Sequence, residues 1–266
     1  MLNAILNSKS GRLGKEAEYN TNWRELFRGS EDLMTATLFE RLSYLPGKTA
    51  WQILVAAAGG RLRPYRVAEI KLAEFWPMWP LEQRQRGVEP DIFLELSLGD
   101  PEKKVHVIVE AKHGARQFAR QLGDELRAWI EVTEEGELPD QIVVLAIGGL
   151  PSDATKTKLQ EDFYEEIEDI DTETLPELLF LPMDWGDLAQ SISTHIASTP
   201  HEKRLVADMS AALALFGYFH ITPSSQLELL LSHRRIDPEV LMNCLMMEVL
   251  KQWERRNQNQ RRLPSV

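Results

Sequence analysis

The chain has little that would point to secretion, membrane insertion or disulfide chemistry. Its 266 residues include one cysteine, Cys244, so no disulfide can form within the chain. No apolar run approaches the ~18 residues that a membrane span needs, and residues 1–15 lack the apolar segment of a signal peptide. We therefore expect a protein of the reducing cytoplasm, without a membrane as partner.

Several common catalytic motifs are missing as well. None of the six histidines forms a His-x-x-x-His pair, so a zinc protease has no support. Gly148-Gly149 is not followed by the Lys-Ser/Thr of a phosphate-binding loop, so no nucleotide-hydrolysing motif is present. Cys244 lies in a Met-rich run, where a small core residue rather than a nucleophile is expected.

The chain also lacks an excess of positive charge. Its formal net charge is −11, which at first argues against a polyanionic partner. The acids are unevenly placed, however, because nine of them lie between Glu161 and Glu177, whereas Arg116, Arg120 and Arg127 lie close together in the sequence. Nucleic-acid binding needs a local basic surface rather than a basic total, so the net charge does not exclude it.

The hydrophobic pattern predicts helices and strands in alternation. Ser30 is a good N-cap for a first helix that Pro46-Gly47 ends. Turn residues Gly99 to Glu102 separate two apolar runs and predict a hairpin. Helices are expected over 30–45, 49–58, 115–132 and 155–167, and strands over 65–76, 92–96, 105–109, 142–147 and 178–181. This order predicts an α/β fold with a mixed central sheet flanked by helices.

Composition divides the chain into three parts. Residues 1–29 are polar and lack a clear period, which indicates an N-terminal arm. Residues 30–198 hold the alternating elements and form the expected catalytic domain. Residues 199–266 are expected to be a helical C-terminal region. In this region, one helix is expected to carry an apolar stripe formed by Leu241, Leu245, Val249 and Trp253. The stripe would pack either on the main domain or on a partner, and the partner could be a second copy of the chain.

Three charged residues converge at the open end of the predicted hairpin. If the turn is centred between Asp100 and Pro101, Asp91 lies directly opposite Glu110, with Cβ atoms about 4.5–5.5 Å apart. Lys112 is two residues beyond Glu110 and projects from the same face. A register shift of one residue would move Asp91 to the other face.

Without a ligand, this arrangement of charges would destabilise the folded chain. Like charges that face each other across two strands destabilise a sheet, and a carboxylate near a core needs a partner or a metal. A divalent cation between Asp91 and Glu110 would remove the repulsion, and Mg²⁺ suits one or two carboxylates completed by water and phosphate oxygens. The alternative is a surface cluster of salt bridges at the hairpin end.

The motif Glu89-Pro90-Asp91, followed by an apolar hairpin and Val109-Glu110-Ala111-Lys112, resembles the PD-(D/E)XK nuclease superfamily. The resemblance covers roughly residues 30–181 and implies a restriction-endonuclease-like fold. It implies that Asp91 and Glu110 bind Mg²⁺, for which Mn²⁺ can substitute, and that Lys112 assists hydrolysis.

Many members of that superfamily add an acid from the first helix and a glutamine after the lysine strand. Glu31 resembles the former and would be a further metal ligand; its alternative is an acid favoured by the helix dipole. Gln121 resembles the latter, with Gln117 one turn away as a rival. Near one stripe of the following helix, Arg116, Arg120 and Arg127 would contact substrate phosphates, unless they belong to a solvated helix face.

Other similar patterns have ordinary interpretations. Glu69-Ile70-Lys71 is a second Glu-x-Lys, but no Pro-Asp precedes it at hairpin distance, so an exposed edge strand is expected. Pro139-Asp140 precedes an apolar strand without a following Glu-x-Lys, which indicates a strand entry. His113 is expected to be an exposed loop histidine rather than a phosphate contact.

The sequence therefore predicts a Mg²⁺-dependent nuclease, endo- or exonuclease, that hydrolyses DNA in preference to RNA. The resemblance implies a role in defence, repair or mobile-element processing. The alternative is a catalytically inactive subunit with a nuclease fold, which would use the acidic stretch and the C-terminal helices to bind a larger complex.

Overall fold

The computed structural model of the chain describes residues 29–218 apart from 83, 85, 86, 135, 136 and 172–174, together with the backbone of two short strands near the N-terminus. These two strands, β1 (Arg12–Leu13) and β2 (Thr21–Asn22), pair antiparallel with each other. The chain divides into two units, Met1–His220 and Ile221–Val266, and every described residue belongs to the first.

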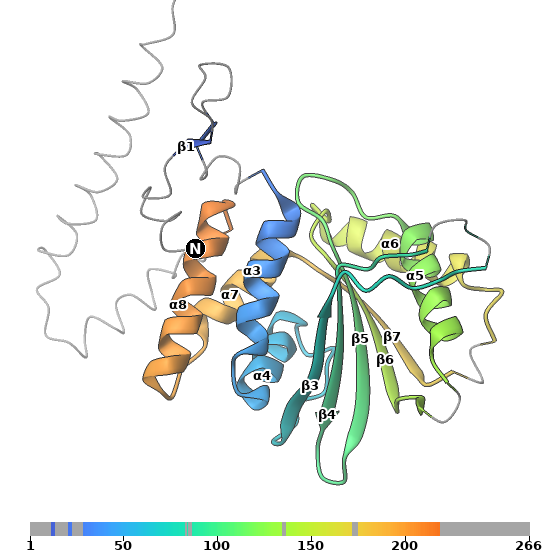
Figure 1. The fold of residues 1–266 in the computed structure, drawn as a ribbon, viewed down its shortest axis with the longest axis horizontal. Helices are drawn as coiled ribbons and strands as arrows, with labels where there is room; N and C mark the ends of the chain where they lie inside the picture. The colour runs from blue at the N-terminus through green and yellow to red at the C-terminus, as the bar shows by residue number, and fades with distance from the viewer. Residues whose placement is uncertain are drawn as a thin grey trace, which may run out of the picture. The chain divides into compact units, whose positions relative to one another are not determined.

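A five-stranded sheet forms the centre of the first unit (Figure 1). Its strands follow one another in chain order: β3 (Ala68–Phe75), β4 (Ile92–Leu98), β5 (Lys103–Ala111), β6 (Gln141–Ile147) and β7 (Glu177–Met183). The first three are antiparallel neighbours, whereas β5, β6 and β7 are parallel. The predicted α/β fold with a mixed central sheet is confirmed.

Helices cover both faces of this sheet and close two separate hydrophobic cores. One face carries α3 (Glu31–Ser43), α4 (Gly47–Ala57), α7 (Trp185–Thr194) and α8 (Pro200–Leu215), and the other carries α5 (Ala119–Val132) and α6 (Asp153–Glu166), as Figure 1 shows. Residues of β4 and β5 alternate between the two cores because successive side chains of a strand point to opposite faces. Val107 and Val109 enter the first core, and Ile108 enters the second.

Helix α3 begins as its sequence predicts. The Ser30 side chain accepts a hydrogen bond from the Leu33 backbone N–H, and Glu31 and Asp32 occupy the first turn, where the helix dipole favours acids. Helix α5 differs, because it begins at Ala119 rather than at 115. Residues 112–118 instead connect the end of β5 to the face of the sheet that α5 covers. Within this connection, Gly114 has a φ of 79°.

The first core continues beyond residue 198, where composition suggested a boundary. Met209, Ala212 and Leu213 of α8 are buried in the same core as Met34 and Leu38 of α3. The stripe from Leu241 to Trp253 and Cys244 lie outside the described residues. In the described part of the chain, no helix combines the length and the apolar content that crossing a membrane requires.

Candidate metal-dependent active site

The hairpin of β4 and β5 has the register that the sequence predicts. Ile92 pairs with Val109 and Leu98 with Lys103, so the numbers of paired residues sum to 201 along the hairpin. One step beyond the first pair, Asp91 faces Glu110. Both residues are buried, and both lie on the face covered by α5 and α6, since their neighbours Phe93 and Ile108 belong to the second core.

Asp91 is held in place by the backbone of β5. Its Oδ2 accepts a hydrogen bond of 2.7 Å from the backbone N–H of Ala111, and its own carbonyl oxygen accepts one of 3.0 Å from Trp76 N–H. The bond to Ala111 attaches the Asp91 carboxylate to the last residue of β5. This bond fixes the Asp91 carboxylate beside the Glu110 side chain, where the two strands end.

Lys112 joins Glu110 to helix α3. Its ammonium donates a hydrogen bond to Glu110 Oε1 and one of 3.2 Å to the Ala111 carbonyl oxygen. The same ammonium lies 3.5 Å from Glu31 Oε1, and Glu31 Oε2 accepts a hydrogen bond from His113 N–H. The structure thus brings Glu31 to the end of β5, 82 positions away in sequence from His113.

Both candidate glutamines contact residues at the end of β5, but they bind different atoms. The Gln121 side-chain amide donates a 2.6 Å hydrogen bond to Glu110 Oε1, the oxygen that Lys112 also contacts. Gln117 donates to the carbonyl oxygens of Glu110 and Ile147, at 3.1 and 3.3 Å. Gln121 therefore orients the carboxylate, whereas Gln117 ties together the ends of β5 and β6.

Burial and neighbouring charges change the proton affinities of Asp91 and Lys112. Burial, followed by the charge of Glu110, raises the pKa of Asp91 from 3.8 to about 7, although the Ala111 N–H and the Lys112 ammonium act in the opposite direction. Burial lowers the pKa of Lys112, but Glu110, Glu31 and Asp91 outweigh burial, so this pKa lies above its ordinary value. Lys112 is therefore a charged ammonium at neutral pH.

Sequence reasoning missed a fourth carboxyl group, that of Glu125. Its side chain is fully buried, and neither carboxyl oxygen has a hydrogen-bond partner of acceptable geometry among the described residues. Burial, followed by the charges of Glu110 and Asp91, raises the pKa of Glu125 well above its ordinary value. The sequence contained a signal, because Glu125 is four residues after Gln121 and so lies on the same face of α5.

Trp185 and Tyr218, which were not predicted from the sequence, contact residues at the end of β5. Trp185, at the start of α7, donates a 2.9 Å hydrogen bond from its indole N–H to the Lys112 carbonyl oxygen. His113 is half-buried, and its Nδ1 lies 3.0 Å from the Tyr218 hydroxyl. Its ring packs edge-on against Phe216 and Tyr218, so the expectation of an exposed loop histidine was wrong.

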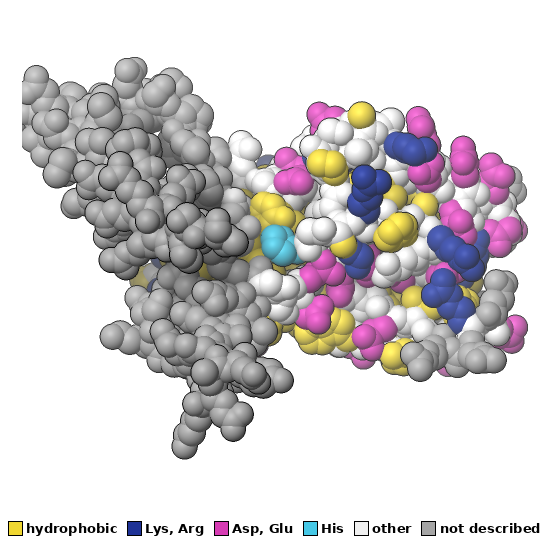
Figure 2. All heavy atoms as spheres, turned by 90° about the horizontal axis from the view of Figure 1, so that it is seen from above, with side chains coloured by type: hydrophobic (Ala, Val, Ile, Leu, Met, Phe, Trp, Pro, Cys, Tyr) yellow, Lys and Arg dark blue, Asp and Glu magenta, His cyan; other side chains and the backbone are white. Residues whose placement is uncertain are grey.

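The arginines after β5 divide into two groups. Arg116 and Arg120 are exposed, and neither forms an ion pair with a described acidic residue. Arg127 instead forms ion pairs with Asp124, Glu166 and Asp169, so it is not free to contact a ligand. Figure 2 shows the molecule from the side at which β5 and β6 end. Where grey atoms do not cover this surface, acidic and basic side chains are interspersed.

The two similar motifs have the interpretations that the sequence suggested. Glu69 and Lys71 lie on the edge strand β3, where their exposed side chains form a 2.6 Å ion pair. Asp140 precedes β6, and its Oδ2 accepts a 2.7 Å hydrogen bond from the backbone N–H of Lys104.

The donor set fits a hard cation that keeps part of its water shell. Among the described residues, no group of three or more His, Cys, Asp and Glu side chains is placed to hold a metal ion. Two facing carboxylates remain, those of Asp91 and Glu110, and Mg²⁺ usually takes one or two carboxylates with waters and substrate phosphates rather than an all-protein cage. Burial, followed by the charge of Glu110, raises the pKa of Asp91, and a bound cation would act against both effects.

Comparisons with known proteins add little about the chemistry. No family model matches the chain. The chain is 29% identical over 226 residues to an uncharacterized protein of Pasteurella multocida (strain Pm70), covering 82% of this chain and 80% of that protein. Among solved structures, it resembles the MspJI restriction endonuclease in complex with a 27-mer oligonucleotide, at 11% identity and a TM-score of 0.30. That match covers 81% of this chain but 42% of the MspJI chain, and a likeness of this size carries no argument about function.

Proposed function

We propose that this protein is a nuclease that hydrolyses phosphodiester bonds with the help of a divalent cation bound at Asp91 and Glu110. The observation that carries the proposal is the pair of buried carboxylates at the end of one hairpin, with the Lys112 ammonium in contact with one of them. A salt-bridge cluster on the surface would keep its charges in water, whereas this pair is buried and mutually destabilising.

Asp91 and Glu110 would hold the cation, with Mg²⁺ the expected ion and Mn²⁺ a substitute. The Ala111 carbonyl oxygen accepts a 3.2 Å hydrogen bond from Lys112 Nζ, which helps to hold this ammonium beside Glu110. When bound, the cation would supply a Lewis acid for a phosphoryl oxygen and lower the pKa of a coordinated water.

Lys112 provides a fixed positive charge beside the phosphorus atom, where negative charge develops on the oxygens during in-line attack. Its ammonium can also hold the attacking water by donating a hydrogen bond to it. Glu31 keeps this ammonium in position from the start of α3, and Gln121 keeps the Glu110 carboxylate oriented from α5. A role for Glu31 as ligand of a second cation is part of the same proposal.

DNA is the proposed substrate, in preference to RNA, and this preference rests on the resemblance to the PD-(D/E)XK superfamily. The exposed Arg116 and Arg120 support a phosphate-containing substrate, since they lie on the loop and first turn after Lys112 and have no described acidic partner. A protein partner or a second copy of the chain could supply the targeting for defence, repair or mobile-element processing.

The decisive experiment compares cleavage of labelled DNA and labelled RNA with Mg²⁺ or Mn²⁺. Asp91→Ala and Glu110→Ala should each reduce the cleavage rate by about 10³-fold or more, because each removes a cation ligand. Glu69→Ala is the matched control, since Glu69 belongs to the other Glu-x-Lys and is exposed. Circular dichroism should show that all variants fold.

Calorimetry separates the enzyme from its alternative, an inactive subunit with the same fold. The wild-type protein should bind Mn²⁺, and Asp91→Ala should not. A wild-type protein that neither binds Mn²⁺ at Asp91 nor cleaves either nucleic acid would contradict the proposed function.

A further inference from the structure

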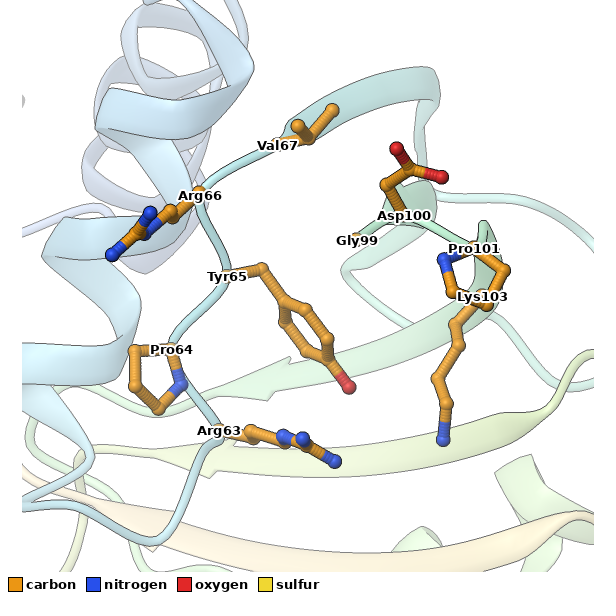
Figure 3. Close-up of a pocket in the computed structure, with 9 residues that line it drawn as sticks. All are labelled: Arg63, Pro64, Tyr65, Arg66, Val67, Gly99, Asp100, Pro101 and Lys103. Carbon is orange, nitrogen blue, oxygen red and sulfur yellow. The ribbon is translucent and has the colours of Figure 1, made fainter.

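A pocket of about 430 Å³ lies at the turn of the β4–β5 hairpin, at the opposite end of the strands from Asp91 and Glu110. One wall is the segment 63–67 between α4 and β3, and the other is formed by Gly99, Asp100, Pro101 and Lys103 (Figure 3). Seven residue steps along β5 separate Lys103 from Glu110, which corresponds to roughly 24 Å at the usual rise of an extended strand. The pocket is therefore separate from the candidate active site.

The walls of this pocket are tied to the core. Buried Trp51 donates a 3.0 Å hydrogen bond from its indole N–H to the Arg63 carbonyl oxygen, and Gly99 N–H donates one of 2.9 Å to the Val67 carbonyl oxygen. Gly99 has a φ of 84°, and a Cβ there would lie 3.0 Å from the Tyr65 ring. The turn thus needs glycine both for its backbone conformation and for the close approach of Tyr65. Such a pocket is formed before any ligand arrives.

The pocket is positively charged in a chain whose net charge is −11. Arg63, Arg66 and Lys103 line it, and none of them forms an ion pair with a described acidic residue. Figure 3 shows that the side chains of Arg63, Tyr65 and Lys103 extend toward the same side of the pocket, whereas the Asp100 carboxylate points away from them. The Arg63 guanidinium is also held over the Tyr65 ring, 5.6 Å from its centroid.

We propose that this pocket binds a small phosphorylated molecule of nucleotide size. Two cationic side chains and a phenolic hydroxyl directed to one side are suited to a phosphate dianion, because charge-assisted hydrogen bonds from arginine and lysine are the strongest that phosphate oxygens accept. The volume is much larger than one phosphate group and falls in the range of small-molecule sites. The rest of the ligand would occupy the remaining space beside Tyr65 and Pro101.

A test uses the full chain, free of divalent metal in EDTA, and two probes: inorganic pyrophosphate and ADP. Isothermal titration should show saturable binding to the wild-type protein. The double variant Arg63→Ala/Lys103→Ala should lose at least about tenfold in affinity, since it removes two charge-assisted contacts. Lys48→Ala is the matched control, because Lys48 is exposed and does not line the pocket. Asp91→Ala should bind both probes as the wild type does, which keeps this result independent of the proposed nuclease.

Three outcomes would overturn the proposal. The first is no saturable binding of either probe, and the second is equal affinity in the wild type and the double variant. The third is a short oligonucleotide that binds through Arg63 and Lys103 while ADP and pyrophosphate do not, since the pocket would then be part of a nucleic-acid surface.

Discussion

Asp91, Glu110 and Glu125 share one region of the interior with a single ammonium, that of Lys112. Glu110 receives the contacts of Lys112 and Gln121, Asp91 receives one backbone N–H, and Glu125 receives no hydrogen bond of acceptable geometry from a described residue. Buried carboxyl groups of this kind reduce the stability of the folded chain when they ionise. Their presence is understandable if ligand binding, rather than stability, is what the site provides.

This arrangement makes stability of the metal-free protein depend on pH. The pKa of Asp91 is about 7 in the folded chain and 3.8 ordinarily, so the folded state binds this proton more tightly than the unfolded state does. The contribution of the protonated Asp91 carboxyl group to folding stability is complete below pH 4 and is lost as pH rises through about 7. Glu125, whose pKa is also raised, acts in the same direction.

We expect the Asp91→Asn variant in EDTA to melt at a higher temperature than the wild type at pH 8, and the difference to shrink at pH 5. The difference should be a few degrees, because 1 kcal/mol shifts Tm by about 2–4 °C in domains of 150–250 residues. The amide oxygen of asparagine can still accept from the Ala111 N–H. Thermal unfolding from pH 5 to 8 measures this effect, and parallel pH profiles of the two proteins would contradict the assignment.

A substitution of Lys112 separates the effect on catalysis from the effect on cation binding. We expect Lys112→Ala to lower the cleavage rate by about 10²–10³-fold, because it removes the fixed charge beside the reacting phosphate. The affinity for Mn²⁺ should stay within about threefold of wild type, since the carboxylates remain. Single-turnover cleavage and calorimetry measure the two quantities. A cleavage rate equal to that of the wild type would exclude Lys112 from the reaction.

At the scale of elements, the site is the meeting point of the ends of β5 and β6 with the starts of α3, α5 and α7. Gly148, directly after β6, allows the closest of these contacts. A Cβ there would lie 2.1 Å from the Lys112 carbonyl oxygen and 2.3 Å from Trp185 Nε1, and its φ is 77°. The hydrogen bond from Trp185 to Lys112 therefore requires glycine at this position.

Gly148→Ala should reduce the free energy of unfolding by about 3 kcal/mol or more, since it combines backbone strain with a clash against backbone and indole. Gly59→Ala is the matched control, because Gly59 has a φ of 60° but no atom within 4 Å of an added Cβ. That control should cost about 1–2 kcal/mol from the left-handed backbone alone. Urea denaturation measures both values, and equal losses would show that the contact between Trp185 and Lys112 adds no stability.

At the scale of the whole molecule, the first unit includes α8 and ends at His220. Its two cores lie on opposite faces of one sheet, and α3 and α8 share the first of them. The half-buried His113 contacts Tyr218 beyond the end of α8. The site thus depends on chain segments from residue 31 to residue 218.

We expect a protein consisting of Met1–His220 to unfold in a single cooperative transition and to bind Mn²⁺ as the full chain does, because every described contact of the site lies within this unit. A second variant, ending after Thr199, should lose cooperative unfolding, since it exposes the core face that α8 covers. Differential scanning calorimetry and titration make the comparison. Similar behaviour of both truncated proteins would show that α8 is dispensable.

The sequence by itself determined the hairpin, its register, the N-cap of α3 and the mixed α/β sheet, because each depends on local signals: turn residues, alternation and capping. It also placed Asp91 opposite Glu110, since pairing across a short turn follows from counting residues. Only the tertiary structure decided that Gln121 and Glu125 of α5 lie over Glu110, that Glu31 reaches Lys112, and that Trp185 holds the end of β5. These contacts join segments far apart in the chain, and their geometry follows from how helices pack on the sheet, which no local pattern specifies.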